Sequence, residues 1–210
     1  MTARHRLVLA SASPARLATL RAAGLDPEVV VSGVDESDID VTAPRDVALV
    51  LARSKAEAVA TSRSEPTWVI GCDSVLELDG QAYGKPTSAE DAVHRWQRMR
   101  GSSGVLHTGH CVVDSATGRS DQATESTTVE FADVTDAEVE AYVATGEPLQ
   151  VAGAFTIDGL GGAFVRRIAG DPHNVVGISL PLLREMFAAL GVTWTDLWAP
   201  TRPGDPDRAR

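Results

Sequence analysis

The chain has 210 residues, of which 43% are hydrophobic, and 29 acidic side chains against 19 basic ones give it a formal net charge of −10 at pH 7. That length and hydrophobic content are enough for one buried core and exclude a disordered or fibrous chain. Because polymeric DNA and RNA are bound by neutralising many phosphates with cations, the acidic balance argues against a nucleic-acid polymer as partner.

Strand and helix patterns alternate along the chain. In chain order the expected elements are a strand over 6–10, a helix over 15–23, a strand over 28–32, a helix beginning at 44, a strand over 68–78, a helix from 88 to about 100, strands over 105–114 and 124–131, a helix from 135 to 146, a strand over 163–168 and a helix over 181–190. Apolar and β-branched runs indicate the strands, while caps and terminal glycines indicate the helices.

Turn signals decide the fold class and the domain organisation. The short turns at 79–80 and 117–118 predict hairpins, which exclude a purely parallel sheet. The fold class is therefore α/β with a mixed sheet. We expect one domain over residues 6–191 and a flexible C-terminal tail over 200–210, which holds three prolines.

Cysteine usage and hydropathy bear on the compartment. Cys72 and Cys111 form neither a disulfide framework nor a CxxC metal motif, which favours two reduced, buried thiols over one disulfide. The apolar run at 7–10 is far shorter than the roughly 7–15 residues of a signal-peptide core. No stretch approaches the roughly 20 apolar residues of a membrane helix. The sequence predicts a cytoplasmic protein with no membrane partner.

The segment over residues 120–165 has an unusual composition. It contains nine acidic and no basic residues, which is typical of a solvated face. Near its end, Gly159, Gly161 and Gly162 lack the spacing of a dinucleotide-binding loop. We therefore expect a tight turn there.

The first candidate site is the turn from strand to helix that contains Ser11, Ser13 and Pro14. Backbone N–H groups at a helix N-terminus attract anions, and Arg16, one turn into the helix, offers two parallel hydrogen bonds to a phosphate. The alternative is an ordinary serine cap followed by a solvated arginine.

Asp73 is the second candidate, because it interrupts the apolar run over 68–78. A carboxylate is costly to bury unless it is paired, hydrogen-bonded or bound to a metal. Gly71, two residues earlier, lets another group approach the strand closely. Beside a phosphate site, Asp73 could hold Mg²⁺ or deprotonate a water. Alternatively, it accepts backbone N–H groups at a bulge or strand end.

Lysine is scarce: two of the 19 basic residues are lysines, Lys55 on a helix and Lys85 in a Gly-Lys-Pro loop, and the rest are arginines. An ammonium group is a compact charge that suits phosphate oxygens, although chance can also leave two lysines in such a chain. Asp35 and Glu36 follow a strand and could share a divalent cation with Asp73. A solvated acidic loop is the alternative.

Taken together, these segments resemble the Maf family of nucleoside triphosphate pyrophosphatases from about residue 7 to 191. The resemblance rests on nine motifs in the family's order, which is specific where one motif alone would be weak. They include Ser11-Ala12-Ser13-Pro14 with Arg16, Asp35-Glu36, Arg53-Ser54-Lys55-Ala56, Gly71-Cys72-Asp73-Ser74, Gly84-Lys85-Pro86, Thr108-Gly109, Tyr142 to Pro148, Gly153-Ala154-Phe155 and Asn174-Val175-Val176-Gly177.

The resemblance implies an elongated mixed sheet with helices on both sides and two lobes around a cleft, similar to inosine triphosphate pyrophosphatases. It implies hydrolysis of a nucleoside triphosphate between its α- and β-phosphates, giving the monophosphate and pyrophosphate, with Mg²⁺, Mn²⁺ or Co²⁺ as cofactor. Such an enzyme could clear non-standard nucleotides, and a homodimer is expected. Because the family is associated with arrest of septum formation, a non-catalytic nucleotide-binding regulator is the alternative function.

The resemblance also assigns the site residue by residue. It implies that Asp73 is catalytic and holds the metal together with Glu36. The positions implied to bind the substrate are Ser11, Ser13, Arg16, Lys55, Ser74 and Lys85. Ser74 replaces a threonine of the family.

Two positions depart from the family members that prefer dTTP and UTP. Ala15 stands where those members commonly carry the first of two arginines, and Asp158 stands where they carry glutamine. A glutamine can donate to and accept from a pyrimidine edge, whereas an ionised aspartate only accepts. The preferred base therefore stays open, as do the physiological metal and any role of catalysis in cell division.

Overall fold

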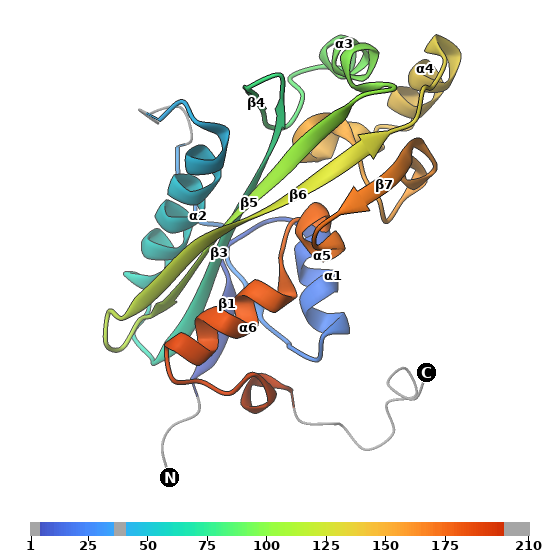
Figure 1. Cartoon of the computed structure of the whole chain (residues 1–210). Helices are drawn as coiled ribbons and strands as arrows, with labels where there is room; N and C mark the ends of the chain where they lie inside the picture. The colour runs from blue at the N-terminus through green and yellow to red at the C-terminus, as the bar shows by residue number, and fades with distance from the viewer. Residues whose placement is uncertain (1–4, 36–40, 200–210) are drawn as a thin grey trace.

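A computed structural model of the chain describes residues 5–35 and 41–199 (Figure 1). Its centre is a seven-stranded mixed sheet in the order β2-β1-β3-β5-β6-β7, with β4 paired to β3. The strands are β1 (Arg6–Leu9), β2 (Glu28–Val29), β3 (Thr67–Leu78), β4 (Gln81–Tyr83), β5 (Ser103–Asp114), β6 (Ser120–Phe131) and β7 (Val165–Ala169). β1 runs parallel to β2 and β3, and the other pairs are antiparallel. The expected α/β class with a mixed sheet is confirmed.

Helices cover both faces of this sheet. The α-helices are α1 (Pro14–Ala22), α2 (Pro44–Ala60), α3 (Ala89–Met99), α4 (Asp136–Ala144), α5 (Pro172–Val176) and α6 (Leu180–Ala189), and the 3₁₀ helices are η1 (Glu147–Gln150), η2 (Ala152–Ala154), η3 (Leu160–Phe164) and η4 (Trp194–Leu197). In Figure 1, α2 follows one face of the long strands, and α1 and α6 lie on the other. None of the described helices is long and apolar enough to cross a bilayer.

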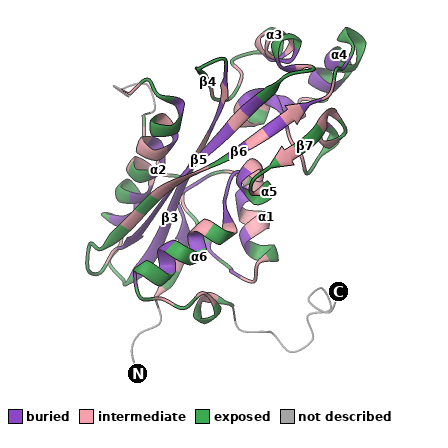
Figure 2. Ribbon diagram, viewed as in Figure 1, coloured by how far each residue is buried: buried purple, intermediate pink, exposed green. Residues whose placement is uncertain are grey.

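Buried residues follow the long strands of the sheet (Figure 2), and their apolar side chains form separate clusters toward its two ends. At one end, Trp96 and Tyr142 pack edge to face over the ends of the long strands. At the other end, Ile70 of β3 faces α6 and packs near Leu183, while the adjacent Val69 faces α2. Because successive strand residues point to opposite faces, β3 serves both layers at that end. The two ends correspond to the two expected lobes.

Two glycines allow α2 to lie directly on the sheet. A Cβ at Gly71 would collide with the carbonyl oxygen of Ala52, and one at Gly109 would collide with that of Ala48. Gly109 is paired in register with Asp73. The bare backbone at these positions therefore brings α2 within side-chain reach of Asp73, as Gly71 led us to expect.

Three expected elements differ in the structure. β2 is only two residues long. The N–H of Val30 still donates to Leu9 O at 3.0 Å, and beyond this residue the chain leaves the edge of the sheet. The glycines after residue 158 form η3 in place of a tight turn. The short helix α5 was not predicted. The expected tail over 200–210 lies outside the described residues.

The two cysteines are free and buried, as expected. Burial raises the pKa of both thiols to about 12. Cys72 and Cys111 are therefore uncharged at neutral pH and unreactive as nucleophiles.

Candidate active site

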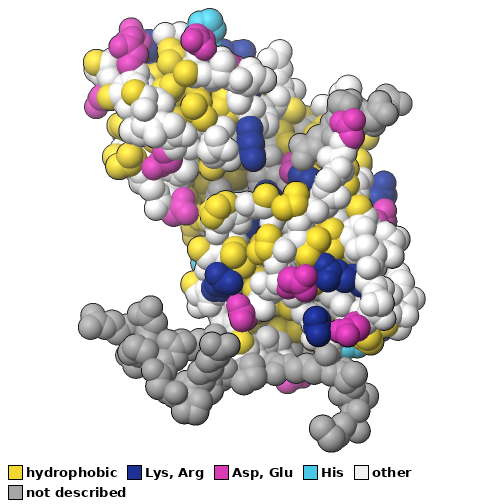
Figure 3. All heavy atoms as spheres, turned by 180° about the vertical axis from the view of Figure 1, so that it is seen from behind, with side chains coloured by type: hydrophobic (Ala, Val, Ile, Leu, Met, Phe, Trp, Pro, Cys, Tyr) yellow, Lys and Arg dark blue, Asp and Glu magenta, His cyan; other side chains and the backbone are white. Residues whose placement is uncertain are grey.

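A cleft of about 1160 Å³ separates the two lobes. Its walls come from segments far apart in the chain: the turn before α1, residues 31–34, α2, β3, the loop after β4, residues 147–159 and residues 175–177. Figure 3 shows the surface hollowed between two bulky parts, with basic side chains at the hollow. Small-molecule sites usually occupy roughly 300–1,000 Å³, so the cleft has room for a nucleotide.

Asp73 of β3 lies in this cleft, and Lys55 reaches it from α2. Lys55 Nζ is 2.6 Å from Asp73 Oδ1, and the two side chains are 13% and 14% exposed. A charge-assisted hydrogen bond of this kind offsets the cost of partly desolvating both ions. Asp73 is therefore tolerated in an apolar strand because it is paired with a cation.

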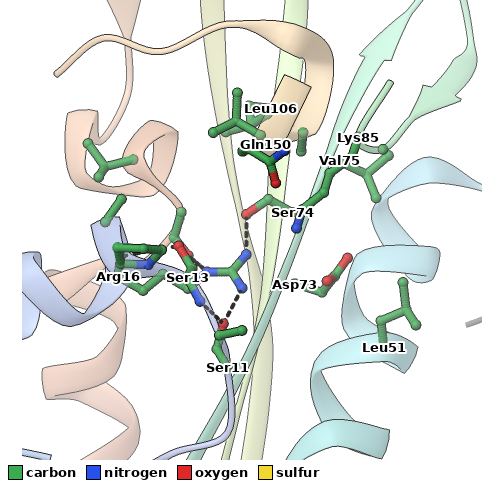
Figure 4. Close-up of a pocket in the computed structure, with 18 of the residues that line it drawn as sticks. Ser11, Ser13, Arg16, Leu51, Asp73, Ser74, Val75, Lys85, Leu106 and Gln150 are labelled. Atoms are coloured by element: carbon green, nitrogen blue, oxygen red, sulfur yellow. Dashed lines mark hydrogen bonds between the residues drawn. The ribbon is translucent and has the colours of Figure 1, made fainter. Parts of the chain in front are cut away.

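Arg16 lies beneath the turn that precedes α1, and only 8% of the residue is exposed. Its Nε donates to Gly177 O at 2.7 Å, its Nη1 to Ser11 Oγ at 3.0 Å and Cys72 O at 2.8 Å, and its Nη2 to Ser74 Oγ at 2.9 Å. Figure 4 shows the guanidinium between Ser11 and Ser74. Four of its five N–H groups thus donate to the protein. These bonds hold the walls of the cleft together, and the expected contact of Arg16 with a phosphate stays a prediction.

The two serines of the same turn have different hydrogen-bonding roles. Ser13 is the N-cap of α1, and its hydroxyl accepts from Arg16 N. The hydroxyl of Ser11 accepts from Arg16 Nη1 and from Ser13 N at 3.3 Å. Because these two bonds use the lone pairs of Ser11 Oγ, its O–H hydrogen is left to donate. Ser11 is thereby prepared to bind an anion.

Ser74 belongs to a chain of polar groups that crosses the sheet. Its Oγ lies 2.9 Å from Thr108 Oγ1, which donates to Asn174 O at 3.0 Å. Thr108 has one hydroxyl hydrogen, so both bonds form only if Ser74 donates to Thr108. The hydroxyl hydrogen of Ser74 is then already used, so toward the cleft Ser74 Oγ can act only as a hydrogen-bond acceptor or a metal ligand.

Lys85 occupies the loop between β4 and α3 and is exposed to the cleft. Figure 4 places it on the other side of Ser74 from Arg16. Within residues 5–35 and 41–199, the Lys85 ammonium makes no hydrogen bond or ion pair. Its charge is therefore available to a ligand in the cleft.

The structure brings the sequence-predicted site residues together. Those that line the one cleft are Ser11, Ser13, Arg16, Lys55, Asp73, Ser74 and Lys85. Ala15 and Asp158 line it too. Glu36, the expected metal ligand, lies outside the described residues.

Glu147 is a structural residue of the cleft that we did not predict individually, although it lies in the Tyr142 to Pro148 motif, because we assigned the acids of its segment to a solvated face. Its carboxylate accepts hydrogen bonds from the Thr156 and Tyr142 hydroxyls and from the N–H groups of Leu160 and Gly161. Burial would raise the pKa of Glu147, but these bonds outweigh it and lower the pKa to about 2. Glu147 therefore fixes the glycine-rich wall of the cleft. No local sequence pattern marks partners so far apart.

Among the described residues, the donor set of the cleft suits a hard divalent cation in combination with a phosphate ligand. The described residues contain no group of three or more His, Cys, Asp and Glu side chains that could hold a metal. Asp73 supplies one carboxylate within the cleft. Magnesium is often bound by one or two carboxylates together with substrate phosphates, and Asp73 fits that arrangement.

Comparisons with known proteins agree with this geometry. The family model described as Maf-like protein matches residues 6–190. Proteins named nucleoside triphosphate pyrophosphatase are similar to this chain: that of Salinispora tropica is 62% identical over 92% of this chain and 88% of its own length, and that of Streptomyces coelicolor is 59% identical over 94% and 96%. One solved structure also matches, that of a nucleoside-triphosphatase (dITP/XTP pyrophosphatase) from Mycobacterium abscessus. Its TM-score is 0.41 and its sequence identity is 15%, over 89% of this chain and 93% of that chain. With the family model covering nearly its whole length, the chain belongs to the Maf family.

Proposed function

We propose that this chain hydrolyses nucleoside triphosphates to the nucleoside monophosphate and pyrophosphate. The observation that carries the proposal is the pairing of Lys55 with Asp73 in a cleft that Lys85 also lines. Cations near phosphate oxygens and a carboxylate near the attacking water are the parts that phosphoryl transfer requires. The names of the similar proteins agree with this activity.

Asp73 acts as the general base in the proposed reaction. Asp73 Oδ1 is engaged by Lys55, so Oδ2 is the atom that takes the proton from the attacking water. The water oxygen bonds to the α-phosphorus while the bond from that phosphorus to the α–β bridging oxygen breaks. Pyrophosphate leaves, and Lys55 and Lys85 neutralise the charge on its oxygens.

The expected divalent cation, Mg²⁺, Mn²⁺ or Co²⁺, would be held by Asp73, with Glu36 as the second expected ligand. When bound, such an ion neutralises phosphate charge and orients the triphosphate. Ser11 and the N-terminus of α1 bind phosphate oxygens independently of the metal, because the Ser11 hydroxyl hydrogen is free to donate.

We further propose that the enzyme works as one domain over residues 6–191, in the cytoplasm and as a homodimer. Ala15 and Asp158 line the cleft, and both differ from the pattern of members that prefer pyrimidines. We therefore expect no preference for dTTP or UTP over purine nucleotides. Clearing of non-standard nucleotides is compatible with such a cleft, and a link to cell-division arrest stays a prediction.

The decisive experiment measures pyrophosphate release from a panel of standard and modified nucleoside triphosphates with Mg²⁺, Mn²⁺ and Co²⁺. The expected products are the monophosphate and pyrophosphate in equal amounts. Release of single phosphate would contradict cleavage between the α- and β-phosphates. Tight nucleotide binding without any hydrolysis would favour the alternative, a non-catalytic regulator.

A further inference from the structure

The backbone that carries Lys85 is held by a side chain from α3. Arg95 Nη1 donates to Gly84 O at 2.6 Å, and Arg95 Nη2 donates to Lys85 O at 3.3 Å. Both carbonyls belong to the loop that presents the Lys85 ammonium to the cleft. Arg95 itself does not line the cleft, so it contacts the loop on the side that faces away from the cleft.

Arg95 is itself fixed on three sides. Its Nε and Nη2 donate to the two carboxylate oxygens of Asp91 at 3.0 and 2.7 Å, and its guanidinium carbon lies 5.3 Å from the centroid of the Tyr83 ring. Asp91 also accepts from Thr87 N at 2.8 Å. The Arg95 side chain is only 11% exposed. A planar fork with five donors can make this set of bonds, and a lysine cannot.

The Gly84 carbonyl also connects the Lys85 loop to a second segment of the cleft wall. Gly84 O accepts from Gly153 N at 3.0 Å as well as from Arg95. Residues 150–152 beside Gly153 line the cleft. The Gly84 carbonyl thus has two donors, Arg95 Nη1 and Gly153 N, that hold the Lys85 loop in place.

We propose that Arg95 is a positioning residue for Lys85, holding the Gly84-Lys85 backbone so that the ammonium meets the triphosphate at little entropic cost. This inference rests on the proposed function of Lys85 as a phosphate ligand. A lysine side chain loses much rotamer freedom when it is fixed, and a mobile backbone would add to that loss on binding. Pro86 further restricts the backbone of Lys85 to extended conformations.

Arg95→Met tests the proposal, and Arg98→Met is its matched control. Arg98 lies one turn further along α3, donates to Tyr83 OH at 2.7 Å and Asp79 Oδ2 at 3.1 Å, and packs over the same ring. It makes no hydrogen bond to the Lys85 loop in the described structure. We expect Arg95→Met to raise KM for the nucleotide about 10-fold with a smaller change in kcat, and Arg98→Met to leave both unchanged.

A double variant separates positioning of Lys85 from general structural support. If Arg95 acts through Lys85, adding Arg95→Met to Lys85→Met produces no further loss, whereas independent effects would multiply. Thermal unfolding of each variant shows whether Arg95→Met destabilises the fold more than Arg98→Met does. Wild-type KM in Arg95→Met, or multiplying effects in the double variant, would overturn this inference and leave the proposed function intact. An inactive wild-type protein, or an unaffected Lys85→Met, would instead refute the role on which the inference rests.

Discussion

The ammonium of Lys55 lies 2.6 Å from the carboxylate of Asp73, and only about one seventh of either side chain is exposed. Each of these groups neutralises the other in the structure. In the proposed reaction, a triphosphate bound in the cleft places further anionic oxygens near Lys55. The pair thus sets a carboxylate and a cation side by side in the cleft, as the proposed hydrolysis requires.

Asp73→Asn keeps the size of the side chain and removes its ability to accept a proton. We expect kcat for pyrophosphate release to fall about 10²–10⁴-fold, the range typical of general-base catalysis. Nucleotide affinity, measured by calorimetry without a divalent cation, should change far less, because Lys85 and Ser11 remain. A kcat close to that of the wild type would remove Asp73 from the reaction.

Arg16→Lys removes the fork that joins Ser11, Ser74 and Gly177. We expect the free energy of unfolding to fall by about 3 kcal/mol, because buried acceptors lose charged donors. Urea denaturation measures this loss. The control is Arg21→Lys on α1, where the arginine side chain is 58% exposed and pairs with Asp26, and the expected change is small. Equal stability of the two variants would show that the fork of Arg16 contributes nothing.

Glu147→Gln tests the glycine-rich wall. The pKa of Glu147 is lowered from its ordinary value of 4.5 to about 2, so its contribution to stability is complete above pH 4.5 and is lost as the pH falls through 2. We expect the variant to lose about 1–3 kcal/mol of unfolding free energy at pH 7 and to approach the wild type near pH 2. Glu140→Gln on the exposed side of α4 is the control. A difference from the wild type that does not vary with pH would contradict this assignment.

Ala15→Arg combined with Asp158→Gln restores the pattern of the pyrimidine-preferring members in the cleft wall. The glutamine can both donate to and accept from a base edge, and the arginine adds a cation near the phosphates. We expect kcat/KM for UTP relative to that for GTP to rise about 10-fold. An unchanged ratio in competition assays would mean that other residues select the base.

Local signals in the sequence were reliable where the interaction is local. The helix expected from residue 135 begins there with a capping box, in which Thr135 and Glu138 bond reciprocally. The Ser88 cap of α3 and the Asp79-Gly80 hairpin before β4 also form. Each of these depends on residues within four positions of one another. The length of β2 was not predictable in this way, because it depends on where an edge strand leaves the sheet.

In the candidate site, too, some residues could be predicted from the sequence, whereas the contacts between distant residues could not. Scarcity of lysine, and an acid in an apolar strand, were enough to single out Lys55, Lys85 and Asp73 without any structure. The partners of Arg16 were not predictable, because Cys72 O lies 56 residues away in the chain. From the sequence, Arg16 was therefore expected only as a phosphate ligand or a solvated side chain, and its role between the walls of the cleft was not predicted. In the structure its charge is held in place by the protein.

The bond from Arg16 Nε to Gly177 O joins positions 161 residues apart. During synthesis the chain emerges from its N-terminus, so Arg16 leaves the ribosome long before its acceptor exists. A nascent chain can form the hairpins of the sheet but cannot finish the floor of the cleft. The connection that Arg16 makes between the walls of the cleft therefore closes only after residue 177 has been synthesised.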